Sequence, residues 1–194
     1  MDFIRSFIAI ELPQQVTHGL ARLQESLLQF TPKGVKWVDP AGIHLTIKFL
    51  GEVPSNRISL ISTNLAEVVK GIKAFSLGVE GLGVFPDSRR PRVVWVAVLG
   101  EVDKLVQLQQ AVDSALSPSG FKKENRPFVP HLTLARLRDD MPFQERQSFG
   151  QRYLAAQLEP LPFFKVESLD LMKSQLTPRG AIYTRLDTFG FSLL

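Results

Sequence analysis

Cysteine is absent from this sequence of 194 residues. Disulfides, thiolate metal ligands and a cysteine nucleophile are therefore excluded. No apolar run reaches the roughly 18 to 20 residues that span a bilayer, and the first residues lack the basic start and long apolar stretch of a signal peptide. We expect a cytoplasmic protein that makes no membrane contact.

Motifs that hold metals and nucleotide phosphates are also missing. The sequence has no HExxH motif and no Asp/His cluster, and the stretch GLGVFP has neither dinucleotide-binding nor P-loop spacing. We therefore expect no metal ion and no cofactor. The formal net charge of +4 favours a polyanionic partner without requiring one.

Hydrophobic periodicity and turn residues predict alternating strands and helices without a low-complexity linker. The length suits one domain or two tightly joined lobes. We expect a single α+β unit over residues 1–194, with strands over 3–11, 43–50, 75–85, 93–99 and 128–137, helices over about 13–30, 54–71, 101–116 and 143–157, and a final hairpin of 164–174 and 181–189 around Thr177–Gly180.

The tripeptide His-Leu-Thr occurs twice, beginning at His44 and at His131, in a chain with only three histidines. On a strand, side chains alternate between faces, so each histidine shares a face with Thr46 or Thr133 while the leucines point into a core. Each copy has a helix before it and another after it. This repetition suggests a duplication that produced two similar lobes around a groove.

Two histidines can divide the work of an acid and a base, because the ordinary pKa of histidine, about 6.5, lies near neutrality. Phosphodiester cleavage needs both roles, since a nucleophile loses a proton while the leaving oxygen gains one. The threonine hydroxyls are suited to stabilising the phosphoryl oxygens. A single strand histidine is more often structural, and we assign His18, in the first helix, no function.

These motifs identify the chain as similar to the two-histidine (2H) phosphoesterases, which are defined by paired His-x-Thr-x motifs with hydrophobic flanks. The segments SFIAIELP, IHLTIKFLGEV, RRPRVVWV, FVPHLTLAR and MKSQLTPRGAIYTRL resemble the bacterial and archaeal RNA 2′,3′-cyclic phosphodiesterase branch, first described as a 2′-5′ RNA ligase. The resemblance covers essentially the whole chain. It implies a bilobal α+β fold with pseudo-two-fold symmetry, in which each lobe is an antiparallel sheet with helices on its outer face and the groove holds both motifs.

The resemblance also implies a reaction, the metal-free hydrolysis of a 2′,3′-cyclic phosphate to a 2′-phosphate. His44 would protonate the departing 3′-oxygen, His131 would activate water, and Thr46 and Thr133 would hold the phosphoryl oxygens. RNA with cyclic phosphate ends, such as tRNA fragments, would be the partner of a monomeric enzyme. Ligation would be the reverse of the same chemistry.

Basic residues supply candidate contacts to substrate. The family branch has a basic residue five positions after the second histidine, here Arg136, but strand alternation places it on the opposite face unless the strand bulges. Lys48, four positions after His44 in the first copy, lies on the same strand face as His44 if the side chains alternate regularly. The guanidinium groups of Arg89, Arg90 and Arg92 suit phosphate contact. A base-stacking platform could include aromatic residues among Phe7, Trp37, Phe85 and Phe128.

Three alternatives stay open. The two histidines could instead hold a metal in a metal-dependent phosphodiesterase. The substrate could be nucleotide-sized, such as an ADP-ribose cyclic phosphate or a cyclic mononucleotide. The protein could also be a non-catalytic RNA-binding module, although both motifs are intact.

Overall fold

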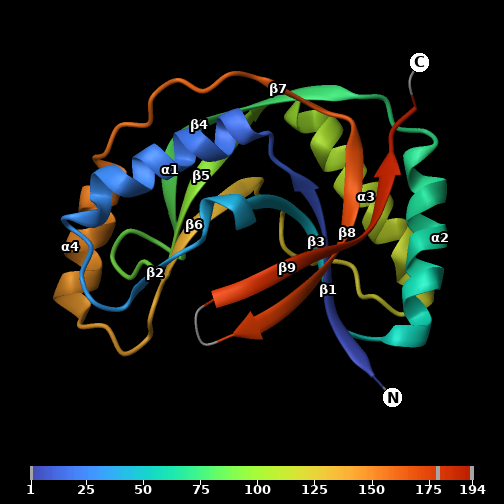
Figure 1. Cartoon of the computed structure of the whole chain (residues 1–194), viewed down its shortest axis with the longest axis horizontal. Coiled ribbons are helices and arrows are strands. Elements are labelled where there is room, and N and C mark those ends of the chain that lie inside the picture. Colours follow the sequence, from blue (N-terminus) through green and yellow to red (C-terminus); the bar gives the residue numbers. More distant parts are fainter. Residues whose placement is uncertain (1, 178–179, 193–194) are drawn as a thin grey trace.

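Nine β-strands form one continuous antiparallel sheet in the part of the chain that the computed structural model describes, residues 2–177 and 180–192 (Figure 1). The strands are β1 (Phe3–Glu11), β2 (Val35–Trp37), β3 (His44–Pro54), β4 (Phe75–Phe85), β5 (Val93–Gly100), β6 (His131–Leu137), β7 (Phe164–Val166), β8 (Ser168–Thr177) and β9 (Gly180–Gly190). The α-helices are α1 (Gln14–Leu28), α2 (Ile58–Val69), α3 (Val102–Leu116) and α4 (Phe143–Leu154).

The strand order in the sheet is symmetric about its centre. It runs β7-β4-β5-β6-β3-β1-β8-β9, and β2 pairs separately with β6. The strands on either side of the β6–β3 junction correspond, so that β5 matches β1 and β4 matches β8. This arrangement has the predicted pseudo-two-fold symmetry, and the α+β class is confirmed.

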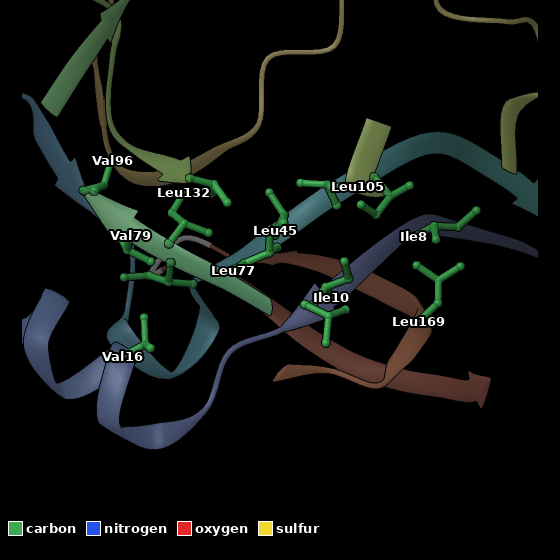
Figure 2. Packing of buried hydrophobic residues seen from close by; sticks show 14 of the residues in the cluster. Ile8, Ile10, Val16, Leu45, Leu77, Val79, Val96, Leu105, Leu132 and Leu169 are labelled. Carbon is green, nitrogen blue, oxygen red and sulfur yellow. The ribbon is translucent and has the colours of Figure 1, made fainter. Parts of the chain in front are cut away.

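The helices cover the face of the sheet that carries the core. Helices α2 and α3 pack together beside β3, β8 and β9, while α4 packs against β4, and Gln24 of α1 donates a hydrogen bond to the carbonyl of Leu134 in β6. Leucine, isoleucine and valine side chains fill the space between these layers (Figure 2). Burying one such side chain contributes about 1.5–3 kcal/mol.

Several segments differ from the sequence-based expectation. Strand β3 continues to Pro54, four residues beyond its expected end, and helix α2 begins at Ile58 rather than at residue 54. Strand β6 begins at His131 rather than at residue 128, since Pro127 and Pro130 have no amide hydrogen for a ladder. The stretch 164–174 is divided into β7, which pairs with β4, and β8, which forms the predicted hairpin with β9. The short strand β2 was not predicted. Residues 178–179 of the predicted turn lie outside the described residues.

Candidate active site

The two His-Leu-Thr motifs meet at the centre of the sheet. Strands β3 and β6 run antiparallel, with Leu45 opposite Leu132. This register places His44 opposite Thr133 and Thr46 opposite His131. Both leucines are fully buried in the core beneath the helices, so the histidines and threonines occupy the opposite face. The structure thus brings together the four predicted catalytic residues.

Each histidine ring is oriented by the same backbone contact. Nδ1 of His44 lies 2.8 Å from the carbonyl oxygen of Gly42, and Nδ1 of His131 lies 2.7 Å from the carbonyl oxygen of Val129. A carbonyl only accepts hydrogen bonds, so Nδ1 must be the protonated nitrogen in both rings. Nε2 of each ring is left to exchange a proton with a ligand.

Aromatic side chains flank both imidazoles. The ring of Phe7 stacks on His44 with centroids 4.6 Å apart, and Tyr183 meets His44 edge-on at 4.9 Å. In the other half, Phe85 and Trp95 meet His131 edge-on at 5.0 and 5.9 Å. These ring contacts restrict the orientation of both imidazoles.

The pKa values of both histidines are lowered from the ordinary value of 6.5. Burial is the largest cause, because it disfavours the charged ring, and the nearby positive charge of Arg136 lowers both pKa values further. The hydrogen bonds to Gly42 and Val129 act in the opposite direction.

A β-bulge follows each motif. Ile8 pairs with Lys48 and Ala9 with Thr46, so Ile47 is an extra residue in β3. In β6, Leu134 is the extra residue, because Val94 pairs with Ala135 and Trp95 with Thr133. A bulge of this kind reverses the alternation of the residues that follow it.

These bulges place Arg136 and Phe49, each five positions after a histidine, on the histidine face. Arg136 lies opposite Val93, and Phe49 lies opposite Phe7. The bulge that the candidate role of Arg136 requires is therefore present. Phe49, whose side chain is 65% exposed, was missed by the sequence analysis. Its equivalence to Arg136 in the duplicated motif was the signal that could have found it.

The duplication is also visible in comparisons with known proteins. The family model for LigT-like phosphoesterases matches the chain twice, over residues 10–95 and 98–183. The chain belongs to this family. Each match contains one His-Leu-Thr motif. The pseudo-two-fold symmetry of the sheet therefore corresponds to the repeat in the LigT-like phosphoesterase sequence.

Related proteins align with nearly the whole length of this chain. The RNA 2′,3′-cyclic phosphodiesterase of Methanothermobacter thermautotrophicus is 31% identical over 96% of this chain and 98% of its own. That of Methanocaldococcus jannaschii is 34% identical over 93% of this chain and 96% of its own. The solved structure of Escherichia coli LigT in apo form has a TM-score of 0.75 at 26% identity, with 99% of both chains covered.

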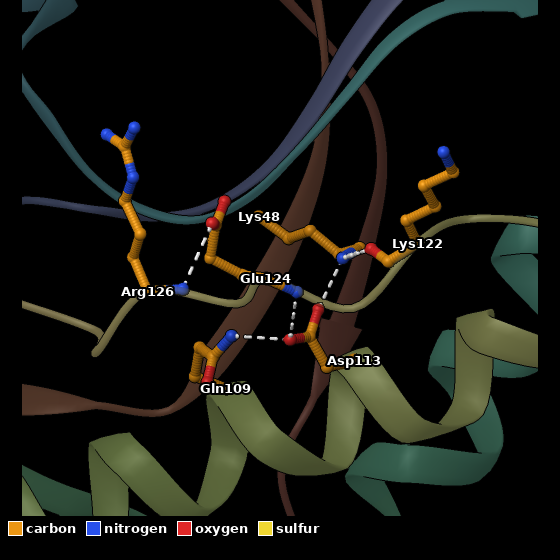
Figure 3. A network of polar contacts seen from close by, with 6 residues as sticks. All are labelled: Lys48, Gln109, Asp113, Lys122, Glu124 and Arg126. Carbon is orange, nitrogen blue, oxygen red and sulfur yellow. Dashed lines mark hydrogen bonds and ion pairs between the residues drawn. The ribbon is translucent and has the colours of Figure 1, made fainter.

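The predicted placement of Lys48 beside His44 and Thr46 is wrong. The bulge directs Lys48 to the helical face, where its ammonium group forms a buried ion pair with Asp113 of α3 and donates to the carbonyl of Lys122 at 2.8 Å (Figure 3). Asp113 also accepts hydrogen bonds from Gln109 and from the backbone of Glu124 (Figure 3). Lys48 therefore anchors the segment that leads to His131 and is not available to a phosphate.

The arginine-rich loop lies next to the His131 half of this LigT-like site, since it directly follows Phe85. Its arginines are exposed. Arg92 forms an ion pair with Asp139 at 3.2 Å, and the guanidinium group of Arg90 lies 6.0 Å from the centre of the Phe143 ring. Asp87 accepts hydrogen bonds from the backbone of Arg89 and Arg90.

Two cavities lie away from the histidines. The larger, about 520 Å³, lies between Val79–Leu82 and the connection 158–163, and the smaller, about 300 Å³, adjoins Phe30 and Phe149. The histidine site is thus a sheet face rather than either cavity. Within residues 2–177 and 180–192, no group of three or more His, Asp or Glu side chains is placed to hold a metal ion. No helix in the same part of the chain is long and apolar enough to cross a membrane.

Proposed function

We propose that this protein is an RNA 2′,3′-cyclic phosphodiesterase that hydrolyses cyclic phosphate ends to 2′-phosphates. The observation that carries the proposal is the matched pair of imidazoles on one sheet face, each with Nδ1 bonded to a carbonyl and Nε2 left for proton transfer. It is supported by the two relatives described above, both of which are named as RNA 2′,3′-cyclic phosphodiesterases.

In this mechanism His44 and His131 have opposite protonation states. Neutral His131 accepts a proton from water at Nε2 as the water oxygen attacks phosphorus. Charged His44 donates its Nε2 proton to the 3′-oxygen as the P–O3′ bond breaks, so the product is a 2′-phosphomonoester. Each proton transfer contributes about 10²–10⁴-fold in rate. After one turnover the two rings have exchanged their protonation states and must re-equilibrate with solvent.

Residues on the same face stabilise the substrate. Thr46 and Thr133 donate hydrogen bonds to the phosphoryl oxygens, which gain negative charge in the transition state. Arg136 contributes a planar guanidinium that can hold two of these oxygens. Phe49 offers an exposed ring on which the terminal base can stack, and Arg89, Arg90 and Arg92 are candidate contacts to the RNA backbone.

Incubation of a short oligoribonucleotide ending in a 2′,3′-cyclic phosphate with the protein in excess EDTA tests this function. We expect a product whose phosphate resists a 3′-specific phosphatase. His44→Ala and His131→Ala should each reduce the rate at least 10²-fold, while His18→Ala, on the exposed side of α1, serves as the matched control. Loss of activity in EDTA would instead support a metal-dependent reaction.

A nucleotide-sized substrate is the second candidate. Escherichia coli LigT, 26% identical to this chain, has been solved in complex with 3′-AMP and with NADP+. Turnover of cyclic mononucleotides or ADP-ribose cyclic phosphate without turnover of the oligonucleotide would favour this candidate. Binding of RNA without turnover of any cyclic phosphate would leave a non-catalytic role.

A further inference from the structure

The strand neighbours of the two histidines differ by one charge. The β1–β3 register places Glu11 opposite His44, and the β5–β6 register places Ala97 opposite His131. Directly opposed residues of antiparallel strands point to the same face. Glu11 therefore lies beside His44 on the histidine face, whereas the equivalent position beside His131 carries a methyl group.

The Glu11 carboxylate is held in place from β9. Arg185 donates a hydrogen bond to Glu11, and its guanidinium nitrogen Nε lies 3.5 Å from the carboxylate of Asp170. Asp170 is buried and accepts a hydrogen bond of 2.6 Å from the hydroxyl of Thr188. Arg185 is thus fixed by two carboxylates, which keeps Glu11 on the side of the sheet where His44 lies.

We propose that Glu11, held by Arg185, is the positioning residue that gives His44, rather than His131, the role of proton donor. This inference rests on the proposed function and deepens it. Both histidines have the same carbonyl contact at Nδ1 and two aromatic neighbours each. The halves also differ at the position five residues after each histidine, which is Phe49 or Arg136, but the charge of Arg136 lowers the pKa of both histidines and so does not separate them. A residue that distinguishes the halves is needed for one histidine to begin the reaction charged and the other neutral.

The charges around His44 support this assignment. Glu11 faces His44 from β1, Arg136 acts on it from β6, and the phenol ring of Tyr183 in β9 meets it edge-on at 4.9 Å. Arg185 of β9 and Asp170 of β8 lie behind Glu11. Burial and Arg136 lower the pKa of His44, whereas its hydrogen bond to Gly42 and the negative charge of Glu11 raise it. At His131, burial and Arg136 lower the pKa and the hydrogen bond to Val129 opposes them. Glu11 thus favours the charged form of His44 selectively.

Histidine titration by NMR tests the inference without substrate. The chain has three histidines, so each can be assigned in isotope-labelled protein by single substitution. In Glu11→Gln we expect the titration midpoint of His44 to move to lower pH while that of His131 stays in place. Glu52→Gln, which removes an exposed carboxylate elsewhere on β3, is the matched control. Glu11→Asp keeps the charge and should restore most of the midpoint of His44.

Ala97→Glu supplies the mirror experiment. A carboxylate introduced opposite His131 should move the midpoint of His131 to higher pH and leave that of His44 unchanged. If Glu11→Gln leaves the His44 midpoint unmoved, or moves both midpoints equally, Glu11 does not distinguish the histidines and the inference is overturned.

The pH profile of turnover tests the assigned roles. If charged His44 is the donor, Glu11→Gln should lose about threefold to tenfold in kcat/KM on the alkaline side and little on the acidic side. A shifted His44 midpoint without this alkaline loss would overturn the donor assignment. An unmodified protein that does not open the cyclic phosphate would disprove the proposed function instead, and the NMR result would still decide whether Glu11 acts on His44.

Discussion

Leu45 of β3 lies directly opposite Leu132 of β6 at the junction between the two halves of the sheet. Both side chains are fully buried, so they fix which residues reach the other face. Because the strands are antiparallel, each histidine faces the threonine of the other motif. The site is therefore built from both halves at once.

Substitution of Thr46 or Thr133 by valine should lower kcat by about 10²-fold while the protein remains folded. Valine keeps the branched shape that suits a strand but removes the hydroxyl that stabilises the developing phosphoryl charge. The measurement is steady-state hydrolysis of the cyclic phosphate oligonucleotide. Thr63→Val, on an exposed turn of α2, is the control, and turnover equal to that control would remove the threonines from the mechanism.

Arg136→Ala should weaken turnover by about 10²-fold and also change its pH dependence. The charge of Arg136 lowers the pKa of both histidines, so its removal raises both pKa values. Both limbs of the kcat/KM profile should then move to higher pH. Arg22→Ala, on exposed α1, should leave the profile unchanged. A loss of rate without movement of the limbs would place Arg136 too far from the histidines to influence them.

The sequence predicted the order of elements because the apolar periodicities of the helices and strands are local signals. The sequence also predicted that His44 shares a strand face with Thr46, and His131 with Thr133. That prediction followed from simple alternation of side chains along a strand, which holds up to the third residue of each motif. The duplicated tripeptide also indicated the pseudo-two-fold that the sheet shows.

The two bulges could not be predicted from local patterns. Ile47 and Leu134 are apolar residues within apolar strands, and only the register with β1 and β5 shows that each is an extra residue. Their consequence is large, because the side chains directly after each bulge, Lys48 and Phe49 in β3 and Arg136 in β6, lie on the face opposite to the one that simple alternation predicts. Lys48 was therefore expected at the site and lies in the core, while Phe49 was overlooked and lies on the histidine face.

Lys48→Met and Asp113→Asn should each destabilise the protein by about 3–5 kcal/mol, because each leaves a buried partner without its counter-ion. Burial would raise the pKa of Asp113, but hydrogen bonds from Lys48, Glu124 and Gln109 outweigh it and hold the pKa below its ordinary value of 3.8. A carboxyl group with a lowered folded-state pKa stabilises the protein above pH 3.8 and loses that contribution as the pH falls further.

Urea unfolding at several pH values measures this effect. The unmodified protein should lose stability as the pH falls below 3.8, and Asp113→Asn should lack that component. The double variant Lys48→Met/Asp113→Leu should recover much of the lost stability, because it removes both charges together. If Lys48→Met raised KM for the cyclic phosphate with no loss of stability, a direct substrate contact would replace this structural role.

The pH profile of turnover should be bell-shaped. For kcat/KM, which reports the free enzyme, the bell should lie on the acidic side of neutrality. Activity requires neutral His131, so kcat/KM falls at low pH, and it requires charged His44, so kcat/KM falls at high pH. Because both pKa values lie below 6.5, the alkaline limb of kcat/KM should begin below that pH.

Bound cyclic phosphate adds a negative charge beside both rings and raises their pKa values, so the limbs of kcat should lie at higher pH than those of kcat/KM. His18→Asn should reproduce both profiles, whereas a rate that rises continuously with pH would show that no charged histidine takes part and that another group protonates the leaving oxygen.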